Sequence, residues 1–286
     1  MKKLTAILFA FVLCLGMIAF SSCTDTKDSN TGKSDKASTD NSAANTKADA
    51  AKTTDKKELI VGIDDKFPPM GFRDEKNEIV GFDIDLAREA ITRMGYKPVF
   101  QPINWNNKTL ELNKGTIDFI WNGFTITDER KKEVLFSKPY LANAQVVLIK
   151  ADSSIKEKSD LKDKKVAAQT DSSGLEALNA DKDITSIMSG KPVEYADYVS
   201  ALNDLKIGRI DAIVLDLVVA DYYMSKQSGT YKMMSEQLAP EQYGVGVKKG
   251  NEKLLTSLQK ALDGMSEDGK SGEISKKWFG SDKVLK

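Results

Sequence analysis

The chain has 286 residues, 41% of them hydrophobic, which is enough for a sizeable core or for two lobes. Its 42 basic and 42 acidic residues give a formal net charge of zero, a balance that offers no basic face to nucleic acid or to an anionic membrane. The sequence contains no histidine, so the commonest general base and the commonest zinc ligand are missing, and we expect neither a metal nor any other cofactor.

The first 22 residues predict a secretory signal peptide. Lys2 and Lys3 give it a positive start, and residues 4–20 form an apolar run. That run is at the short end for crossing a bilayer, which leaves a single transmembrane anchor as the alternative. The small residues before Cys23 resemble a lipoprotein cleavage box, so we predict that Cys23 carries lipid (palmitate) and anchors the protein to the cell membrane. Cys14 would leave with the leader, so no disulfide could form within the mature chain.

Residues 23–57 predict a lipidated cysteine followed by a disordered tether. After Cys23 this segment has no aromatic and no large aliphatic residue, so it cannot bury enough apolar surface to become ordered. A flexible chain of that length would reach on the order of 30–35 Å. Such a tether suits a soluble domain that is held near a membrane.

From residue 59 onward, apolar runs typical of buried strands alternate with apolar residues at helical spacing. The predicted strands are residues 59–63, 99–103, 117–121, 166–168, 193–195, 210–215 and 242–247. This alternation favours right-handed βαβ units and mostly parallel sheets. The composition becomes polar from residue 150 onward, where we place a lobe boundary. We therefore predict a first lobe from residues 58–148 and 242–286, and a second lobe from residues 149–241.

Residues 121–130 bring several polar groups together within ten positions. The segment runs from a predicted strand end through Gly123 into a helix that we expect Thr127 to cap. It offers strand-end carbonyl groups, the Thr125 hydroxyl and the Arg130 guanidinium. Such groups can accept hydrogen bonds from an ammonium and donate hydrogen bonds to a carboxylate, and a free amino acid has both of these charged groups. The alternative is an ordinary strand–loop–helix junction with a surface arginine.

Residues 125–132, with the sequence Thr-Ile-Thr-Asp-Glu-Arg-Lys-Lys, resemble the ligand loop of the polar amino-acid-binding proteins of ABC importers. This is the family of the glutamine-, histidine- and lysine/arginine/ornithine-binding proteins, and the resemblance runs over roughly residues 58–280. It implies the type II periplasmic-binding-protein fold, in which two α/β lobes with mostly parallel sheets are joined by two crossing strands. Residues 136–140 with 145–149 would form the first of these crossings, and residues 242–247 the second. It also implies an extracytoplasmic, lipid-anchored monomer that captures a free amino acid for a membrane permease and its ATPase.

The resemblance carries over a set of ligand-contacting residues. They are Asp64, Phe67, Trp105, Asn122, Gly123, Thr125, Arg130, Ser172 and Asp216. It places the ligand carboxylate on Arg130 and on the helix start at Ser172. The ammonium would meet Asp216, a carbonyl of Asn122 or Gly123, and the Thr125 hydroxyl. Phe67 and Trp105 would form two aromatic walls around the ligand side chain.

The residues themselves support these roles, each with a plainer alternative. Carboxyl ends of parallel strands face the crevice of such sheets, so Asp64 and Asp216 would reach it unless they only cap a turn and a helix. Trp105 could instead belong to the core. We expect Ser172 or Ser173 to cap the following helix, and that capping could occur without contact to a ligand. We expect Asp83 to be a helix cap. Aromatic faces beside carboxylates favour a cationic or amide side chain, so basic amino acids and glutamine rank ahead of cystine or cysteine.

Two other functions stay open on the same fold. Cyclohexadienyl dehydratases look similar, and an enzyme of that kind needs a general acid or base in the cleft. Without histidine, the candidates here are Asp64, Asp65, Asp171 and Asp216, and we expect no enzymatic activity. A surface adhesin is the third possibility.

Overall fold

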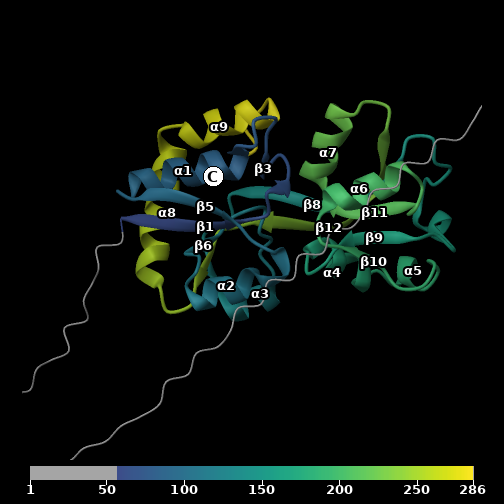
Figure 1. Cartoon of the computed structure of the whole chain (residues 1–286), viewed down its shortest axis with the longest axis horizontal. Coiled ribbons are helices and arrows are strands. Elements are labelled where there is room, and N and C mark those ends of the chain that lie inside the picture. Colours follow the sequence, from purple (N-terminus) through teal and green to yellow (C-terminus); the bar gives the residue numbers. More distant parts are fainter. Residues whose placement is uncertain (1–56, 286) are drawn as a thin grey trace, which may run out of the picture. The chain divides into compact units, whose positions relative to one another are not determined.

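The computed structural model describes residues 57–285 (Figure 1). The predicted signal peptide, the predicted lipidation site at Cys23 and the tether up to residue 56 lie outside these described residues. Within residues 57–285, no helix is both long and apolar enough to cross a membrane.

The first lobe is built on a five-stranded sheet in the order β5–β1–β6–β13–β7. Its strands are β1 (Glu58–Ile63), β5 (Lys97–Pro102), β6 (Phe119–Ile120), β7 (Val134–Phe136) and β13 (Gly246–Lys248). β1 runs parallel to both β5 and β6, whereas β13 is antiparallel to its neighbours β6 and β7. A segment from near the end of the chain therefore completes a sheet that the start of the folded chain begins.

Helices cover both faces of this sheet (Figure 1). They are α1 (Phe82–Arg93), α2 (Lys108–Lys114), α3 (Asp128–Glu133), α8 (Glu252–Glu267) and α9 (Lys270–Phe279). α1, α8 and α9 pack on one another, while α2 packs on β1, β6 and β13. A small antiparallel sheet of β2 (Lys66–Phe67), β3 (Gly71–Arg73) and β4 (Ile79–Val80) follows β1, and a 3-10 turn, η1 (Trp105–Asn107), follows β5.

The second lobe is built on a sheet in the order β10–β9–β11–β8–β12. Its strands are β8 (Leu141–Lys150), β9 (Val166–Gln169), β10 (Val193–Tyr195), β11 (Ala212–Asp216) and β12 (Tyr231–Tyr243). Its helices are α4 (Ser173–Ala180), α5 (Lys182–Thr185), α6 (Tyr198–Lys206) and α7 (Leu217–Lys226), with the 3-10 turn η2 (Lys158–Leu161). β9, β10 and β11 are parallel, and β8 is antiparallel to both β11 and β12.

The chain passes between the two sheets at two short segments, and both are shorter than the sequence predicted. β8 pairs with β11 or β12 from Leu141 to Lys150, so the predicted crossing at residues 145–149 belongs to the second sheet. Only residues 137–140 separate β7 from β8. The predicted strand 242–247 is likewise divided between β12 and β13 by Gly244 and Val245. The apolar run 145–149 is buried because β8 lies inside its sheet, with a strand on each side.

Candidate ligand-binding site

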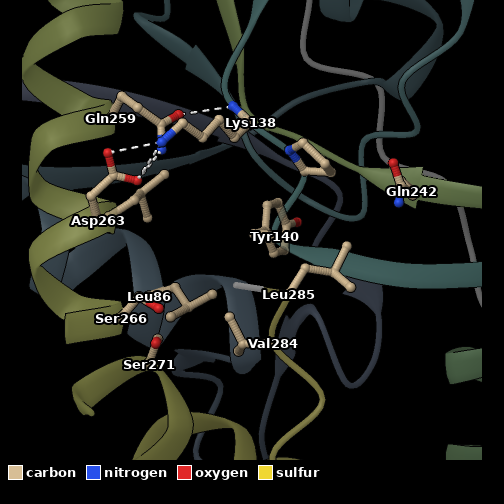
Figure 2. A pocket seen from close by; sticks show the side chains of 12 residues that line it. Leu86, Lys138, Tyr140, Gln242, Gln259, Asp263, Ser266, Ser271, Val284 and Leu285 are labelled. Atoms are coloured by element: carbon tan, nitrogen blue, oxygen red, sulfur yellow. Dashed lines mark hydrogen bonds and ion pairs between the residues drawn. The ribbon is translucent and has the colours of Figure 1, made fainter. Parts of the chain in front are cut away.

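A cavity beside the first crossing segment is a poor match for an amino acid. It is lined by residues such as Leu86, Tyr140 and Leu285 (Figure 2). Its charged groups are already paired, because the Lys138 ammonium lies 3.1 Å from the carboxylate of Asp263. The cavity therefore has no free charge for either end of a zwitterion.

A second cavity lies between the lobes, and almost every residue that the sequence singled out lines it. Its lining residues are Asp64, Phe67, Trp105, Asn122, Gly123, Arg130, Gln169, Ser172, Ser173 and Asp216. Of the predicted set, Thr125 alone does not line it, but its Oγ1 lies 3.0 Å from Oγ of the lining residue Ser173. Gln169 and Ser173 were not predicted as ligand residues. Arg130 and Asp216, from different lobes, share this one cavity.

Arg130 is held at the cavity by the start of α3. Oγ1 of Thr127 accepts a hydrogen bond from the Arg130 backbone N–H at 3.2 Å, which confirms the predicted cap. The guanidinium is buried, and Nη1 donates to the carbonyl of Thr125 at 3.0 Å. Nη2 lies 3.3 Å from a carboxylate oxygen of Glu176, a half-exposed residue of α4 in the other lobe. The central carbon of the Arg130 guanidinium, Cζ, also lies 5.0 Å from the centroid of the Phe124 ring. The side chain is therefore fixed in place.

The start of α4 faces the same region from the second lobe. The Ser172 hydroxyl accepts from the Leu175 N–H at 3.0 Å, so the predicted cap is confirmed, and it donates to the Gln169 carbonyl at 2.7 Å. Ser173, the next residue, contacts Thr125 across the lobes. The helix start thus places two serine hydroxyls beside the cavity.

Asp216 ends β11 with its carboxylate buried. Oδ1 accepts from Nδ2 of Asn143 at 2.8 Å, from Nε2 of Gln145 at 3.0 Å and from the Tyr243 hydroxyl at 2.5 Å. It makes no side-chain capping bond to α7, so simple helix capping does not explain its presence. Burial, together with the neighbouring carboxyl of Glu241, raises the pKa of Asp216 well above its usual value.

Asp64 directly follows β1 and also lines the cavity. Its Oδ2 accepts from Nε2 of Gln169 at 2.7 Å, and its Oδ1 accepts from the Lys66 N–H at 2.9 Å. Burial raises the pKa of Asp64 to about 6, so mild acid adds a proton to it. The neighbouring Asp65 instead pairs with Arg73 at 2.6 Å and does not line the cavity.

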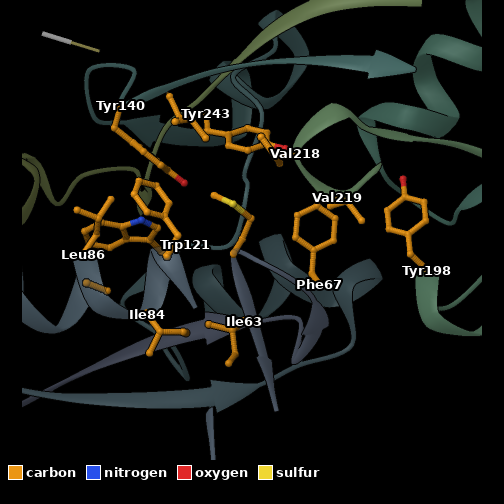
Figure 3. Packing of buried hydrophobic residues seen from close by; sticks show 14 of the residues in the cluster. Ile63, Phe67, Ile84, Leu86, Trp121, Tyr140, Tyr198, Val218, Val219 and Tyr243 are labelled. Carbon is orange, nitrogen blue, oxygen red and sulfur yellow. The ribbon is translucent and has the colours of Figure 1, made fainter. Parts of the chain in front are cut away.

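The two predicted aromatic walls, Phe67 and Trp105, both line the cavity and are fixed by packing outside it. The Phe67 ring centroid lies 5.8 Å from that of Tyr198 on α6, within an apolar cluster that continues from one lobe into the other (Figure 3). Trp105 meets Phe124 edge to face at 6.0 Å. Rings held in this way can stack on a ligand without first becoming ordered.

Asp83 plays a different part from the one predicted. α1 has Gly81 at its N-cap and no side-chain capping bond, so the prediction that Asp83 caps this helix was wrong. The carboxylate is completely buried, and its Oδ2 accepts from the Gly123 N–H at 2.7 Å and from the Tyr140 hydroxyl at 2.9 Å. It therefore fixes the backbone of the cavity residue Gly123. Burial raises the pKa of Asp83 to about 7.

Gly123 should tolerate no side chain. Its φ is +59°, and an added Cβ would lie 2.7 Å from Cε1 of Phe67. We expect Gly123→Ala to lower the free energy of unfolding by roughly 1–2 kcal/mol through backbone strain, and to weaken ligand affinity by displacing the Phe67 ring. Thermal unfolding and calorimetry would measure the two effects.

Gly115→Ala is the matched control, because Gly115 has a φ of +78° and open space around its Cα. It should show a similar loss of stability and unchanged affinity. An equal loss of affinity in both variants would contradict the role assigned to the Gly123–Phe67 contact.

No metal centre is evident in the part of the chain that the structure describes. Within residues 57–285, no three or more histidine, cysteine, aspartate or glutamate side chains are grouped in a way that could hold an ion.

Comparison with known proteins agrees with this site. Residues 59–281 match the profile of the bacterial extracellular solute-binding proteins, family 3. The L-cystine-binding protein TcyJ of Escherichia coli K12 is 33% identical over 227 residues, covering 78% of this chain and 83% of that protein. The ABC transporter glutamine-binding protein GlnH of Bacillus subtilis 168 is 31% identical, covering 99% of both chains. The crystal structure of an ABC uptake transporter substrate-binding protein from Streptococcus pneumoniae with bound histidine has a TM-score of 0.79 and 38% identity, covering 81% of this chain and 96% of that one.

Two of these proteins are named as binding proteins of ABC transporters and the third as an L-cystine-binding protein, which does not favour a dehydratase-like enzyme. The two sheets with flanking helices agree with the type II periplasmic-binding-protein fold predicted from the sequence. The family profile covers most of the chain, and the predicted resemblance to amino-acid-binding proteins of ABC transporters is confirmed. This chain therefore belongs to the bacterial extracellular solute-binding proteins, family 3.

Proposed function

We propose that this protein captures a free polar amino acid outside the cytoplasm and delivers it to an ABC permease and its ATPase subunits. One observation carries the proposal: a buried guanidinium and a buried carboxylate from different lobes line a single cavity. A zwitterion can satisfy both charges at once, whereas an uncharged or singly charged solute cannot. The names of the relatives, which refer to cystine and glutamine, support the same class of ligand.

The ligand carboxylate would bind at Arg130. One arm of the guanidinium is used by the Thr125 carbonyl, and the other now meets Glu176 at 3.3 Å. Because Glu176 is half exposed, an incoming carboxylate can replace it at the planar fork at small cost. Backbone N–H groups at the start of α4, near Ser172, would add donors to the same carboxylate.

The ligand ammonium would bind at Asp216. The three hydrogen-bond donors that Asp216 already meets, from Asn143, Gln145 and Tyr243, all contact its Oδ1. The Thr125 hydroxyl and a carbonyl of Asn122 or Gly123 would complete the set of acceptors.

The ligand side chain would lie between Phe67 and Trp105, with its tip near Asp64. Gln169 now donates its amide to Asp64, so a guanidinium, ammonium or amide of the ligand could take over that bond. We therefore favour a basic amino acid or glutamine, with cystine or cysteine as the next candidates.

Capture would close the two lobes over the ligand by rotation at the crossing segments, and the permease would recognise the closed form. Ion pairs between the lobes support this picture of closure. The Lys66 ammonium lies 2.9 Å from Asp197, and the buried ammonium of Lys108 lies 2.5 Å from Asp171. Opening the cleft would break both pairs.

Lipid on Cys23 would hold this monomeric protein at the cell membrane, with residues 24–57 as a spacer. We assign no residue to catalysis. The carboxylates of the cavity serve to bind charge, and the protein would return its ligand unchanged.

A thermal-shift screen against the common amino acids tests the proposal. An amino acid present at about 100 times its dissociation constant should add roughly 2.7 kcal/mol to the free energy of unfolding. We expect a basic amino acid or glutamine to give the largest shift. No shift with any amino acid would contradict the proposal, and formation of product from prephenate or arogenate by the purified protein would replace it with the dehydratase alternative.

A further inference from the structure

A second carboxyl group, that of Glu241, lies directly behind the proposed ammonium site. Asp216, Gln145 and Ala239 are register partners across the neighbouring strands β11, β8 and β12, and Glu241 pairs in register with Asn143. Nδ2 of Asn143 donates to Oδ1 of Asp216 at 2.8 Å and to Oε1 of Glu241 at 2.5 Å. Nε2 of Gln145 does the same at 3.0 Å and 2.9 Å. Two amide groups thus join the two carboxyl groups into one unit.

No cation balances these two acids in the described chain. Neither Asp216 nor Glu241 forms an ion pair with a lysine or arginine among residues 57–285. The other titratable groups that face them are Tyr243 of β12 and Tyr198 of α6, and burial raises the pKa of both phenols well above the usual value. β8 faces them with its two amides, and α4 with the Ser173 hydroxyl, which lies 3.2 Å from Gln145.

Two ionised carboxylates in such a place would repel each other without a counter-charge. Asp216 is buried and Glu241 is partly buried. The usual outcome for like charges that share such a site is that one proton stays on the pair. The raised pKa of Asp216 agrees with this, since burial is its main cause and the charge and hydrogen bond of Glu241 come next. The ligand ammonium would be the missing counter-charge.

We propose that Asp216 and Glu241 act together as one proton-sharing acceptor, and that binding of the ligand ammonium releases the shared proton to solvent. The inference rests on the proposed function and adds regulation by pH to it. It makes Glu241 a positioning residue for the ammonium, although Glu241 does not line the cavity. The ligand ammonium brings one positive charge into the site. Both carboxyl groups then become ionised, and one proton is released to solvent.

This release of a proton makes ligand affinity depend on pH. Below the pKa of the pair, binding must displace a proton, so affinity should fall by roughly tenfold for each unit of decreasing pH. Above that pKa the pair is already ionised, and affinity should be independent of pH. Acidification would therefore loosen capture.

Calorimetry with L-arginine, L-glutamine and L-cystine would test the inference between about pH 5 and about pH 7, where the α-groups of these ligands keep their charges. The binding enthalpy measured in buffers with different ionisation enthalpies gives the number of protons released. We expect up to one proton released by the wild-type protein. Glu241→Gln should release fewer protons and should show a flatter dependence of affinity on pH.

Glu236→Gln is the matched control, because Glu236 is an exposed acid of the same strand and pairs with Lys158 at 2.6 Å on the surface. It should keep the wild-type proton release. Binding with no proton release, or a release that Glu241→Gln leaves unchanged, would overturn the inference while leaving amino-acid capture intact. The second result would point to Asp216 alone or to Asp64 as the source of the proton. A failure of all three amino acids to bind would overturn both the inference and the proposed function.

Discussion

An Arg130→Met variant should lose roughly 2–5 kcal/mol of amino-acid binding free energy, because truncation leaves the ligand carboxylate buried without a partner. Since each 1.4 kcal/mol corresponds to about tenfold in affinity, the loss amounts to roughly 30-fold to several thousand-fold. Isothermal titration calorimetry would measure it. Arg130→Lys should recover only part of the affinity, because an ammonium cannot form the two parallel bonds of the guanidinium fork.

Lys131→Met and Lys132→Met are matched controls on the same helix. Both lysines are exposed and pair only with Asp128 and Glu129 on the surface, at 3.0 Å and 2.6 Å. These variants should bind like the wild type. If Arg130→Met retained full affinity for an amino acid that binds the wild type, the carboxylate would have to be held elsewhere, and the helix start at Ser172 would be the next place to examine.

Removing the buried carboxylate of Asp83 should cause the largest loss of stability. Asp83→Ala leaves the Gly123 N–H and the Tyr140 hydroxyl without their acceptor, at a cost of roughly 2–5 kcal/mol in the free energy of unfolding. Because Gly123 would lose its fixed position, ligand affinity should fall as well. Chemical denaturation would measure the first effect and calorimetry the second.

The raised pKa of Asp83, about 7, also predicts how stability depends on pH. An unfolded aspartate has a pKa of about 3.9, so between about pH 4 and about pH 7 the folded protein holds a proton that the unfolded chain has lost. Stability of the ligand-free protein should therefore fall as pH rises through this window, by up to roughly 1.4 kcal/mol per pH unit from this group. Asp64, with a pKa raised to about 6, adds an effect of the same sign. Asp83→Asn should reduce the slope.

Asp85→Ala provides the comparison, since Asp85 lies two residues further along the same helix. It pairs with Lys277 at 2.6 Å and accepts from the Trp278 indole at 2.8 Å near the surface, which is worth about 1 kcal/mol or less. An Asp83→Ala protein as stable as Asp85→Ala would mean that Gly123 and Tyr140 find other acceptors.

The sequence was informative where function depends on neighbours along the chain. Thr127 and Ser172 were recognised as caps because a cap is defined by the next three residues. Arg130 was predicted as a ligand residue from the same short segment, residues 121–130. Asp64 and Asp216 followed from the rule that strand ends face the crevice, and the lining of the cavity includes both.

The sequence was uninformative where function depends on distant partners. Gln169 contacts Asp64 from 105 positions away, and Gln145 contacts Asp216 from 71 positions away. No spacing rule connects such pairs, because register between strands is set by the whole sheet. Asp83 was misjudged for a related reason. Aspartate is a preferred capping residue at the start of a helix. Only the folded structure shows that the Asp83 carboxylate is buried and accepts hydrogen bonds from Gly123 and Tyr140 instead.

The place of β13 between β6 and β7 also constrains the order in which the protein can be assembled. Residues 246–248 are synthesised and exported only after every strand of the second sheet, yet the first sheet stays open until they arrive. The second lobe is contiguous in the chain and can complete its sheet before β13 is present. In the first lobe, β6 keeps an unpaired edge until β13 is added. Such an edge is a site for wrong pairing, so the interval between export of β6 and arrival of β13 is when this protein most needs protection from aggregation.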